Sequence, residues 1–144
     1  MLYPSICHKI PVYAVHDLKR ISAFVPTYKT LPEILADDEL AALGDAYVNL
    51  VYSLYLSAKS GRAVGEKVDN RALSEALRHA GLRKHLAART DRHKQADAAE
   101  SLLVYAWLKE KITITESVGV LMKHEDAVEA FSSLLSHVDR RLGL

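Results

Sequence analysis

Three carboxylates stand amid apolar residues in stretches whose composition favours helices. Asp45 follows Leu43 and Gly44, and Asp97 and Glu100 lie in the segment Asp-Ala-Ala-Glu. Residues three apart are neighbours on a helix, so Asp97 and Glu100 repel each other unless a cation or water screens them. Magnesium prefers oxygen ligands and commonly binds through one or two carboxylates together with substrate phosphate. The pattern indicates either a divalent-metal site or three acids that face solvent at the edges of helices.

The charges of the chain are unevenly distributed, although the net charge is only +1. Residues 61–94 carry nine Lys and Arg against four Asp and Glu, whereas residues 37–60 and 95–144 are net acidic. A basic stretch between acidic ones is typical of a site that binds a polyanion together with divalent cations. The alternative is a solvated helix face with its loops, and charge alone favours that simpler interpretation.

The elements that must position these residues are helices. All four prolines lie in the first 32 residues, and the rest of the chain is rich in the helix formers Ala, Leu, Glu, Lys and Arg. No stretch alternates with period two, so the sequence predicts an all-α fold of six or seven helices. A short helix is expected at 15–24 and a turn at 82–86. The main helices are expected at 37–58, 69–80, 90–111, 113–122 and 128–142.

Capping residues mark where the main helices begin. The expected N-caps are Asp37 or Asp38, Asp69, Thr90 or Asp91, and Thr113 or Thr115. Gly81 is expected just after the end of the second main helix.

The helix that begins near residue 37 has one predicted apolar face. Its members are Leu40, Leu43, Tyr47, Leu50, Val51 and Leu54. Gly44 interrupts this helix, where glycine costs about 1 kcal/mol relative to alanine. A glycine at such a position indicates that another part of the chain packs closely against it.

Composition excludes several classes of protein. Cys7 is the single cysteine, so no internal disulfide forms. No apolar run approaches the roughly 20 residues needed to cross a bilayer. Charged residues and histidines interrupt the first 24 residues, unlike the apolar core of a signal peptide. We therefore expect one cytoplasmic domain formed by residues 1–144.

Two segments resemble conserved segments of the ribonuclease III family. Residues 40–46, Leu-Ala-Ala-Leu-Gly-Asp-Ala, resemble the first, which centres on Leu-Gly-Asp, and residues 97–103, Asp-Ala-Ala-Glu-Ser-Leu-Leu, resemble the second. Between them, the segment Asn-Arg-Ala-Leu that begins at Asn70 and the pair Gly81-Leu82 resemble the intervening helix and its end. The resemblance covers about residues 37–110, and no similarity is recognised in residues 1–36 or 111–144.

The resemblance implies a ribonuclease III-like helical bundle that acts as a homodimer and cleaves double-stranded RNA, with one site for each strand. Asp45, Asp97 and Glu100 fall on the metal-binding acids of the family, and Asp38 falls where a further acid is often found. The implied cofactor is Mg²⁺, for which Mn²⁺ could substitute, and it would activate water for attack on a phosphodiester. Double-stranded RNA is bound mainly through phosphates and 2′-hydroxyls. The implied RNA contacts are the basic residues before the acidic helix: Arg78, Arg83, Lys84, Arg89, Arg92 and Lys94.

One position departs from the family pattern. In the long bacterial enzymes a glutamate stands four residues before the Leu-Gly-Asp aspartate, whereas here that residue is Ala41. The short Mini-III branch also has a small residue there and is a nuclease. No double-stranded RNA-binding domain is expected after the helical core, as in Mini-III and the short archaeal members. We therefore expect an endoribonuclease. The alternatives are an inactive RNA-binding scaffold dimer and a helical interaction protein without an RNA role.

Overall fold

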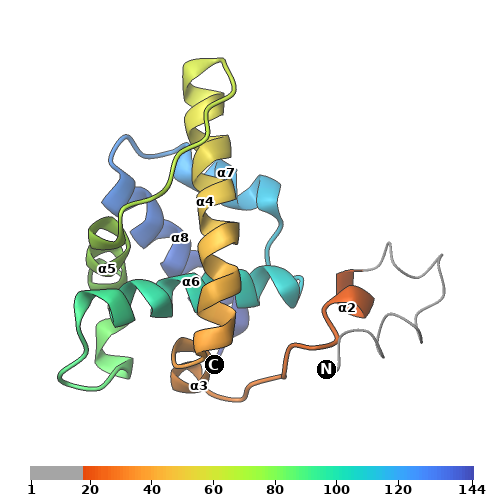
Figure 1. The fold of residues 1–144 in the computed structure, drawn as a ribbon, viewed down its shortest axis with the longest axis vertical. Coiled ribbons are helices and arrows are strands. Elements are labelled where there is room, and N and C mark those ends of the chain that lie inside the picture. Colours follow the sequence, from red (N-terminus) through yellow and green to blue (C-terminus); the bar gives the residue numbers. More distant parts are fainter. Residues whose placement is uncertain (1–17) are drawn as a thin grey trace.

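The computed structural model describes residues 18–144, and within this range it is all-helical. It contains seven α-helices, one 3-10 turn and no strand. In chain order the elements are α2 (Leu18–Ile21), α3 (Leu31–Leu35), α4 (Asp38–Ser60), α5 (Asn70–His79), the turn η2 (Arg83–His85), α6 (Arg92–Leu108), α7 (Ile114–Leu121) and α8 (Ala127–Leu142) (Figure 1). The predicted all-α class and number of helices are confirmed. Cys7 lies outside the described residues.

Side chains cap the beginnings of the five longest helices. Asp37 caps α4 by accepting a hydrogen bond from the Leu40 N–H, and Asp91 caps α6. Thr113 and Glu116 form a reciprocal capping box at the start of α7. Where the sequence offered two candidates, the cap is the residue directly before the helix, and its backbone is extended as a cap requires. The full set is Asp37, Asp69, Asp91, Thr113 and Asp126.

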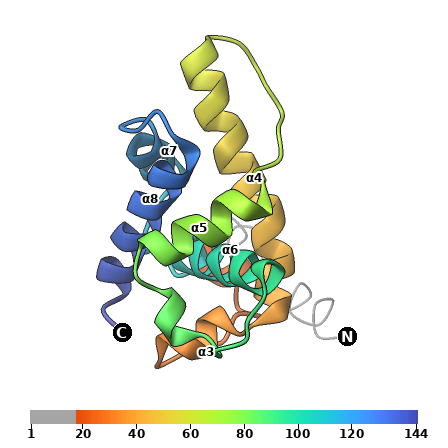
Figure 2. The same ribbon diagram turned by 90° about the vertical axis from the view of Figure 1, so that its left-hand side faces the viewer.

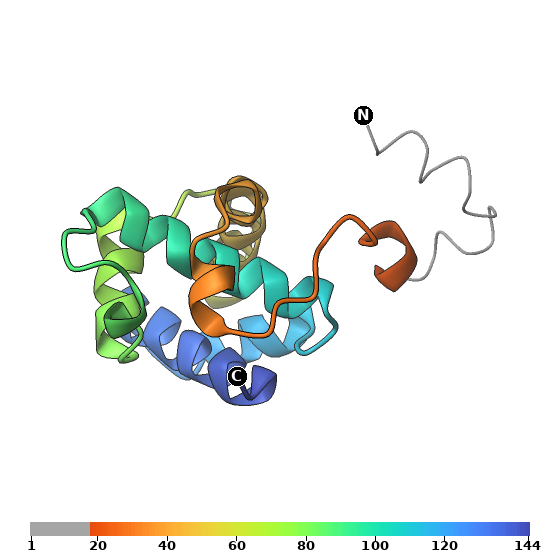
Figure 3. The same cartoon turned by 90° about the horizontal axis from the view of Figure 1, so that it is seen from below.

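Helix α6 is the centre of the fold. It packs against α3, α4, α5 and α8, and it lies between α4 and α8 in Figure 3. Figure 2 shows α5 lying over one side of α6. Eleven of its seventeen residues are buried. Because neighbours surround this helix, Glu100 is buried and Asp97 is partly covered.

The predicted apolar face of α4 is only partly buried. Leu40, Tyr47 and Val51 are buried as expected. The remaining three leucines are exposed, to 39%, 49% and 39%: Leu43, Leu50 and Leu54. Helical periodicity places all six on one broad sector, but the other described residues cover only the side nearer α6. An uncovered leucine stripe therefore runs along α4.

The beginning of the described chain also differs from the prediction. Of the helix expected at 15–24, only residues 18–24 are described. Among these, α2 ends at Ile21 rather than Phe24, and both side chains are exposed; Val15 lies outside the described residues. Helix α3 was not predicted, because it is one short turn that contains Pro32. Proline is compatible with the first turn of a helix, where its missing N–H has no partner to lose.

Helix α6 ends at Leu108, before the predicted end at Lys111. The Glu110 N–H donates to the Trp107 carbonyl and the Lys111 N–H donates to the Ala106 carbonyl. These two bonds form a Schellman ending, in which Glu110 takes the left-handed conformation with φ of 56°. The ending is difficult to predict because glycine usually occupies this position.

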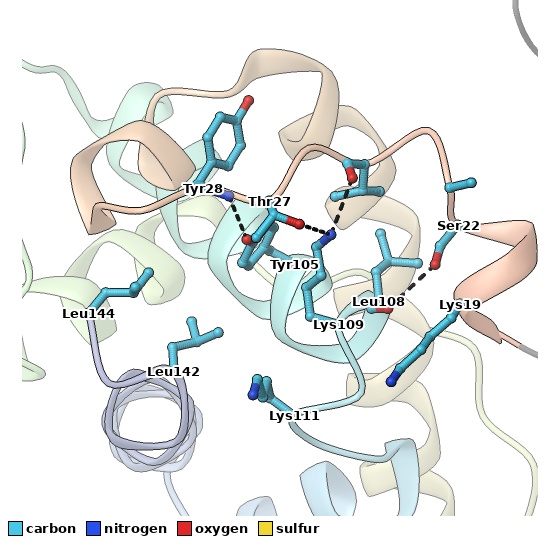
Figure 4. Close-up of a pocket in the computed structure, with 12 residues that line it drawn as sticks. Lys19, Ser22, Thr27, Tyr28, Tyr105, Leu108, Lys109, Lys111, Leu142 and Leu144 are labelled. Atoms are coloured by element: carbon cyan, nitrogen blue, oxygen red, sulfur yellow. Dashed lines mark hydrogen bonds between the residues drawn. The ribbon is translucent and has the colours of Figure 1, made fainter.

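A cavity of about 600 Å³ lies where residues 22–28 meet the ends of α6 and α8 (Figure 4). Lys109 at its edge donates to the Val25 carbonyl at 3.2 Å and to the Thr27 hydroxyl at 3.1 Å. The Tyr28 N–H donates to the Tyr105 hydroxyl at 2.9 Å. These bonds hold the segment before α3 against α6. None of the predicted acids lines this cavity.

The helices of residues 18–144 include no segment with the length and apolar character needed to traverse a lipid bilayer.

Candidate active site

The predicted acids converge on one hollow between α4, α5 and α6. Its volume is about 340 Å³. Helix α4 contributes Asp38 and Asp45, and α6 contributes Asp97 and Glu100. The remaining lining residues are Ala41, Ala42, Asn70 and Lys94. All four candidate metal ligands therefore border a single space, although Asp45 and Asp97 are 52 positions apart in the sequence.

Gly44 allows α4 and α6 to approach each other at this point. A Cβ added at Gly44 would lie 2.6 Å from the carbonyl carbon and 3.0 Å from the Cβ of Glu100, and it would also clash with the carbonyl oxygen. The packing reason expected for this glycine is thus the backbone of α6. The same contact brings Glu100 beside Asp45, the next residue on α4.

Glu100 is the most deeply placed of the four acids. It is only 3% exposed, and its Oε2 has no hydrogen-bond partner among the described residues. Burial raises the pKa of Glu100 to about 8, with further increases from the hydrogen bond and charge of Asp45 and from the charge of Asp97, against a small opposing effect of Lys67. Without a cation, Glu100 therefore carries a proton at neutral pH.

Asp97 is half-buried beside the same space. Burial raises its pKa, and the nearby Asp38 carboxylate raises it further, whereas the Lys94 ammonium opposes both. Lys94 also forms an ion pair with Asp38 at 3.3 Å, and the Asp38 side chain is 72% exposed. The exposure of the acids thus increases across the hollow, from the buried Glu100 to the solvated, ion-paired Asp38.

The carboxylates that could hold a cation are therefore Asp38, Asp45, Asp97 and Glu100. Among residues 18–144, no three or more His, Cys, Asp or Glu side chains are grouped closely enough to form a ready metal cage. The arrangement has oxygen donors on two facing helices with open space between them.

The predicted RNA contacts lie in two groups. Lys94 lines the hollow itself, whereas the other five lie between the end of α5 and the first turn of α6. Arg83 is partly occupied, because it donates to the Ala88 carbonyl at 2.9 Å. A neighbouring hollow shares Asp38, Lys94 and Asp97 with the acidic one and extends to His85 in η2. The acids and part of the basic stretch therefore border adjoining spaces.

Two asparagines near the acids were not predicted as site residues. Asn70 lines the hollow and its side chain is 3.2 Å from Nδ1 of His93. Asn49 donates to Oδ1 of Asp45 at 3.3 Å. The signal for Asn49 was its spacing, since residues four apart on a helix are neighbours.

The two aromatic side chains of α6 pack within the domain, and His79 pairs with Glu129. Tyr105 is buried, and the half-buried Trp107 stacks on Tyr47 with ring centroids 5.1 Å apart. His79 contacts Glu129 at 2.9 Å rather than any acid of the hollow.

The fold and the site define the class of protein: it is an all-helical domain whose two longest helices, α4 and α6, place acids around one hollow. The family model named Ribonuclease III matches residues 38–143. This chain belongs to the ribonuclease III family, and that membership indicates a ribonuclease-like role. The match extends the similarity recognised at 37–110 through α7 and α8. No curated protein matches the sequence.

Proposed function

We propose that this protein is a divalent-metal-dependent endoribonuclease that hydrolyses phosphodiester bonds of double-stranded or structured RNA. One observation carries the proposal: Asp45, Asp97 and Glu100, which stand at the positions of the family's metal-binding acids, border the same hollow. A protein without metal chemistry gains nothing from burying Glu100, which raises its pKa, beside two further acids that raise it more.

The donor set suits Mg²⁺, and also Mn²⁺. Magnesium keeps several of its waters and needs only one or two carboxylates together with substrate phosphate, so a closed protein cage is not required. Glu100 supplies a buried carboxylate oxygen, Oε2, that has no hydrogen-bond partner among residues 18–144. A cation bound there would offset the repulsion between the acids.

The residues around the hollow would have different roles according to their positions. Asp45, Asp97 and Glu100 would hold the cation, and Asp38 would join them from the solvated rim. A bound divalent ion supplies activated water and stabilises the leaving oxygen of the phosphodiester. Lys94 would contact a phosphate at the mouth of the hollow. No side chain has to act as the nucleophile.

RNA would bind along the adjoining hollows and the basic stretch. Contacts to a duplex are mainly to phosphates and 2′-hydroxyls, which spaced cations can make without reading bases. Besides Lys94, the cations that would contact RNA lie between the end of α5 and the start of α6: Arg78, Arg83, Lys84, Arg89 and Arg92.

The working form would be a homodimer joined through the leucine stripe of α4. Leu43, Leu50 and Leu54 follow one line along the helix, and exposed apolar surface of this kind is typical of protein interfaces. The exposed Phe24 and Leu43 border a common apolar hollow of about 560 Å³ at one end of the stripe. A two-fold axis would pair the stripe with itself, as closed homodimers require.

A catalytically inactive RNA-binding dimer is the second candidate. The observation that favours it is Ala41, which lines the hollow where long bacterial enzymes have a glutamate. Such a protein would bind duplex RNA and leave it intact.

The deciding experiment is a cleavage assay on a labelled RNA duplex with Mg²⁺, beside a metal-free control. Glu100→Gln should abolish cleavage while preserving the fold, and the matched control Glu125→Gln, at a side chain that is 97% exposed, should cleave like the wild type. Binding without cleavage in Mg²⁺ and in Mn²⁺ would instead support the inactive scaffold. A wild-type protein that does not bind duplex RNA would contradict both candidates.

A further inference from the structure

The connector between α4 and α5, residues 61–69, is held along α4 by side chains of the helix. Ser57 donates to the Val64 carbonyl at 3.2 Å and accepts from the Val64 N–H at 2.8 Å. Ser53 donates to the Glu66 carbonyl at 3.0 Å and accepts from the Glu66 N–H at 2.9 Å. Four helical residues rise by about 6 Å and two extended residues by about 6.6 Å, so the two segments stay in step.

Asn49 occupies the third position of this series, one turn closer to the acids. Its Oδ1 accepts from the Val68 N–H at 2.9 Å. Because a backbone N–H can only donate, the oxygen of the amide must face Val68 and its NH₂ group must face the other way. The NH₂ group lies 3.3 Å from Oδ1 of Asp45. The connector therefore determines the orientation of a neutral side chain that donates to Asp45.

We propose that Asn49 is a positioning residue that holds the Asp45 carboxylate in the orientation needed to bind a divalent cation. This inference rests on the proposed metal-dependent function. Asp45 is exposed, so without a partner its side chain would sample several rotamers and lose that freedom on binding metal. The Asn49 amide contacts Oδ1, one of the two carboxylate oxygens of Asp45. Groups that orient a ligand in this way tune metal affinity without contacting the metal.

The test separates this role from simple attachment of the connector. Asn49→Ser makes the series uniform, because a serine can bond the connector backbone as Ser53 and Ser57 do but is too short to reach Asp45 as well. Ser53→Ala is the matched control: it removes both bonds to Glu66 and leaves Asn49 and Asp45 untouched. Calorimetric titration of the RNA-free proteins with Mg²⁺ and Mn²⁺ measures affinity directly, and thermal unfolding reports on the connector.

We expect Asn49→Ser to weaken metal affinity about tenfold, within the range for second-sphere partners, at an almost unchanged melting temperature. Ser53→Ala should lower the melting temperature and leave metal affinity unchanged. In cleavage assays, Asn49→Ser should need more Mg²⁺ for half-maximal rate and should keep the wild-type KM for RNA. Wild-type metal affinity in Asn49→Ser, or an equal loss in Ser53→Ala, would overturn the positioning role.

The outcomes also separate this inference from the proposed function. An inactive wild-type protein whose metal affinity still falls on Asn49→Ser would support Asn49 and contradict the nuclease. An active wild-type enzyme in which Asn49→Ser changes nothing would overturn Asn49 alone. A wild-type protein that binds neither metal would overturn both, because Asp45 would then have no cation to bind.

Discussion

Gly44 of α4 lies against the backbone of Glu100 of α6, so closely that even a methyl group at Gly44 would overlap the Glu100 carbonyl group. Each of these residues adjoins or belongs to the acidic set: Gly44 precedes Asp45, and Glu100 lies three residues after Asp97. The two longest helices thus approach each other closely at the site. Any residue that separates the helices there also separates the acids.

Gly44→Ala should therefore lower the free energy of unfolding by about 1–3 kcal/mol, the usual cost of overpacking, despite the better helix propensity of alanine. Gly119→Ala is the matched control, because a Cβ at Gly119 in α7 meets nothing within 4 Å. It should stabilise the protein by up to about 1 kcal/mol. Denaturant unfolding of both variants checks the difference, and an equally stable Gly44→Ala protein would contradict the close packing.

The raised pKa of Glu100 predicts that the metal-free protein loses stability as pH rises. The pKa is about 8 in the folded state against 4.5 for the free side chain, so the folded state binds the proton more tightly. The stabilising effect is complete below the unfolded pKa and is lost as pH rises through the folded pKa, by an amount on the order of 3 kcal/mol. Glu100→Gln should flatten this decline. Denaturant midpoints measured across that pH window in a chelator check it, and an unchanged slope in the variant would contradict the assignment.

Binding of a divalent cation should release a proton, because the ligand form of Glu100 is the carboxylate and the metal-free form is protonated at neutral pH. Metal affinity should then rise with pH until about pH 8 and level off above it. Titrations in buffers with different ionisation enthalpies count the protons released. Glu100→Gln should release fewer, and a wild-type protein that releases none would be inconsistent with Glu100 as a ligand.

Ala41→Glu should restore the glutamate of the long bacterial enzymes and strengthen binding of Mg²⁺. Ala41 is buried at the wall of the hollow, so the added carboxylate should also destabilise the metal-free protein through repulsion and burial. Ala46→Glu is the matched control, since Ala46 is an exposed residue of α4 outside the hollow. Unfolding with and without Mg²⁺ tests the prediction: the stabilisation by Mg²⁺ should be larger in Ala41→Glu alone.

Leu50→Lys should dissociate the proposed homodimer, because it places a charge in the middle of the leucine stripe. Leu50 is 49% exposed, so the monomer should fold normally. Met122→Lys, at an exposed residue at the end of α7, should leave the dimer intact. Sedimentation equilibrium distinguishes the two masses. A wild-type protein that is monomeric at high concentration would refute the interface.

The sequence pointed to the candidate site residues more directly than to the packing around them. Asp45, Asp97 and Glu100 were identifiable because acids in apolar helical sequence stand out, and Gly44 indicated a close approach of another element. The periodic pattern could not separate the buried side of α4 from the exposed leucines. Periodicity marks an apolar sector, and only the packed fold shows how much of it the chain itself covers.

Local exceptions account for the other differences. Helix α3 is too short to produce a periodic pattern, and its Pro32 resembles a turn signal. The end of α6 depends on Glu110 in a left-handed conformation, which sequence rules assign to glycine or asparagine. Asn49 was missed because its role depends on Val68, which reaches it only through the path of the connector.

The hydrogen bonds between α4 and its connector fix the register of residues 64–68 along the helix. One inserted residue between Val64 and Val68 would shift every later residue by half a repeat, and Asn49 would no longer meet the Val68 N–H. Residues 62 and 63 lie outside this register and follow the left-handed Gly61 that ends α4. Differences in loop length among related sequences are therefore expected before Val64. A change in length after Val64 would displace Val68 from Asn49 and so alter the orientation of Asp45, which lies four residues from Asn49 on the helix.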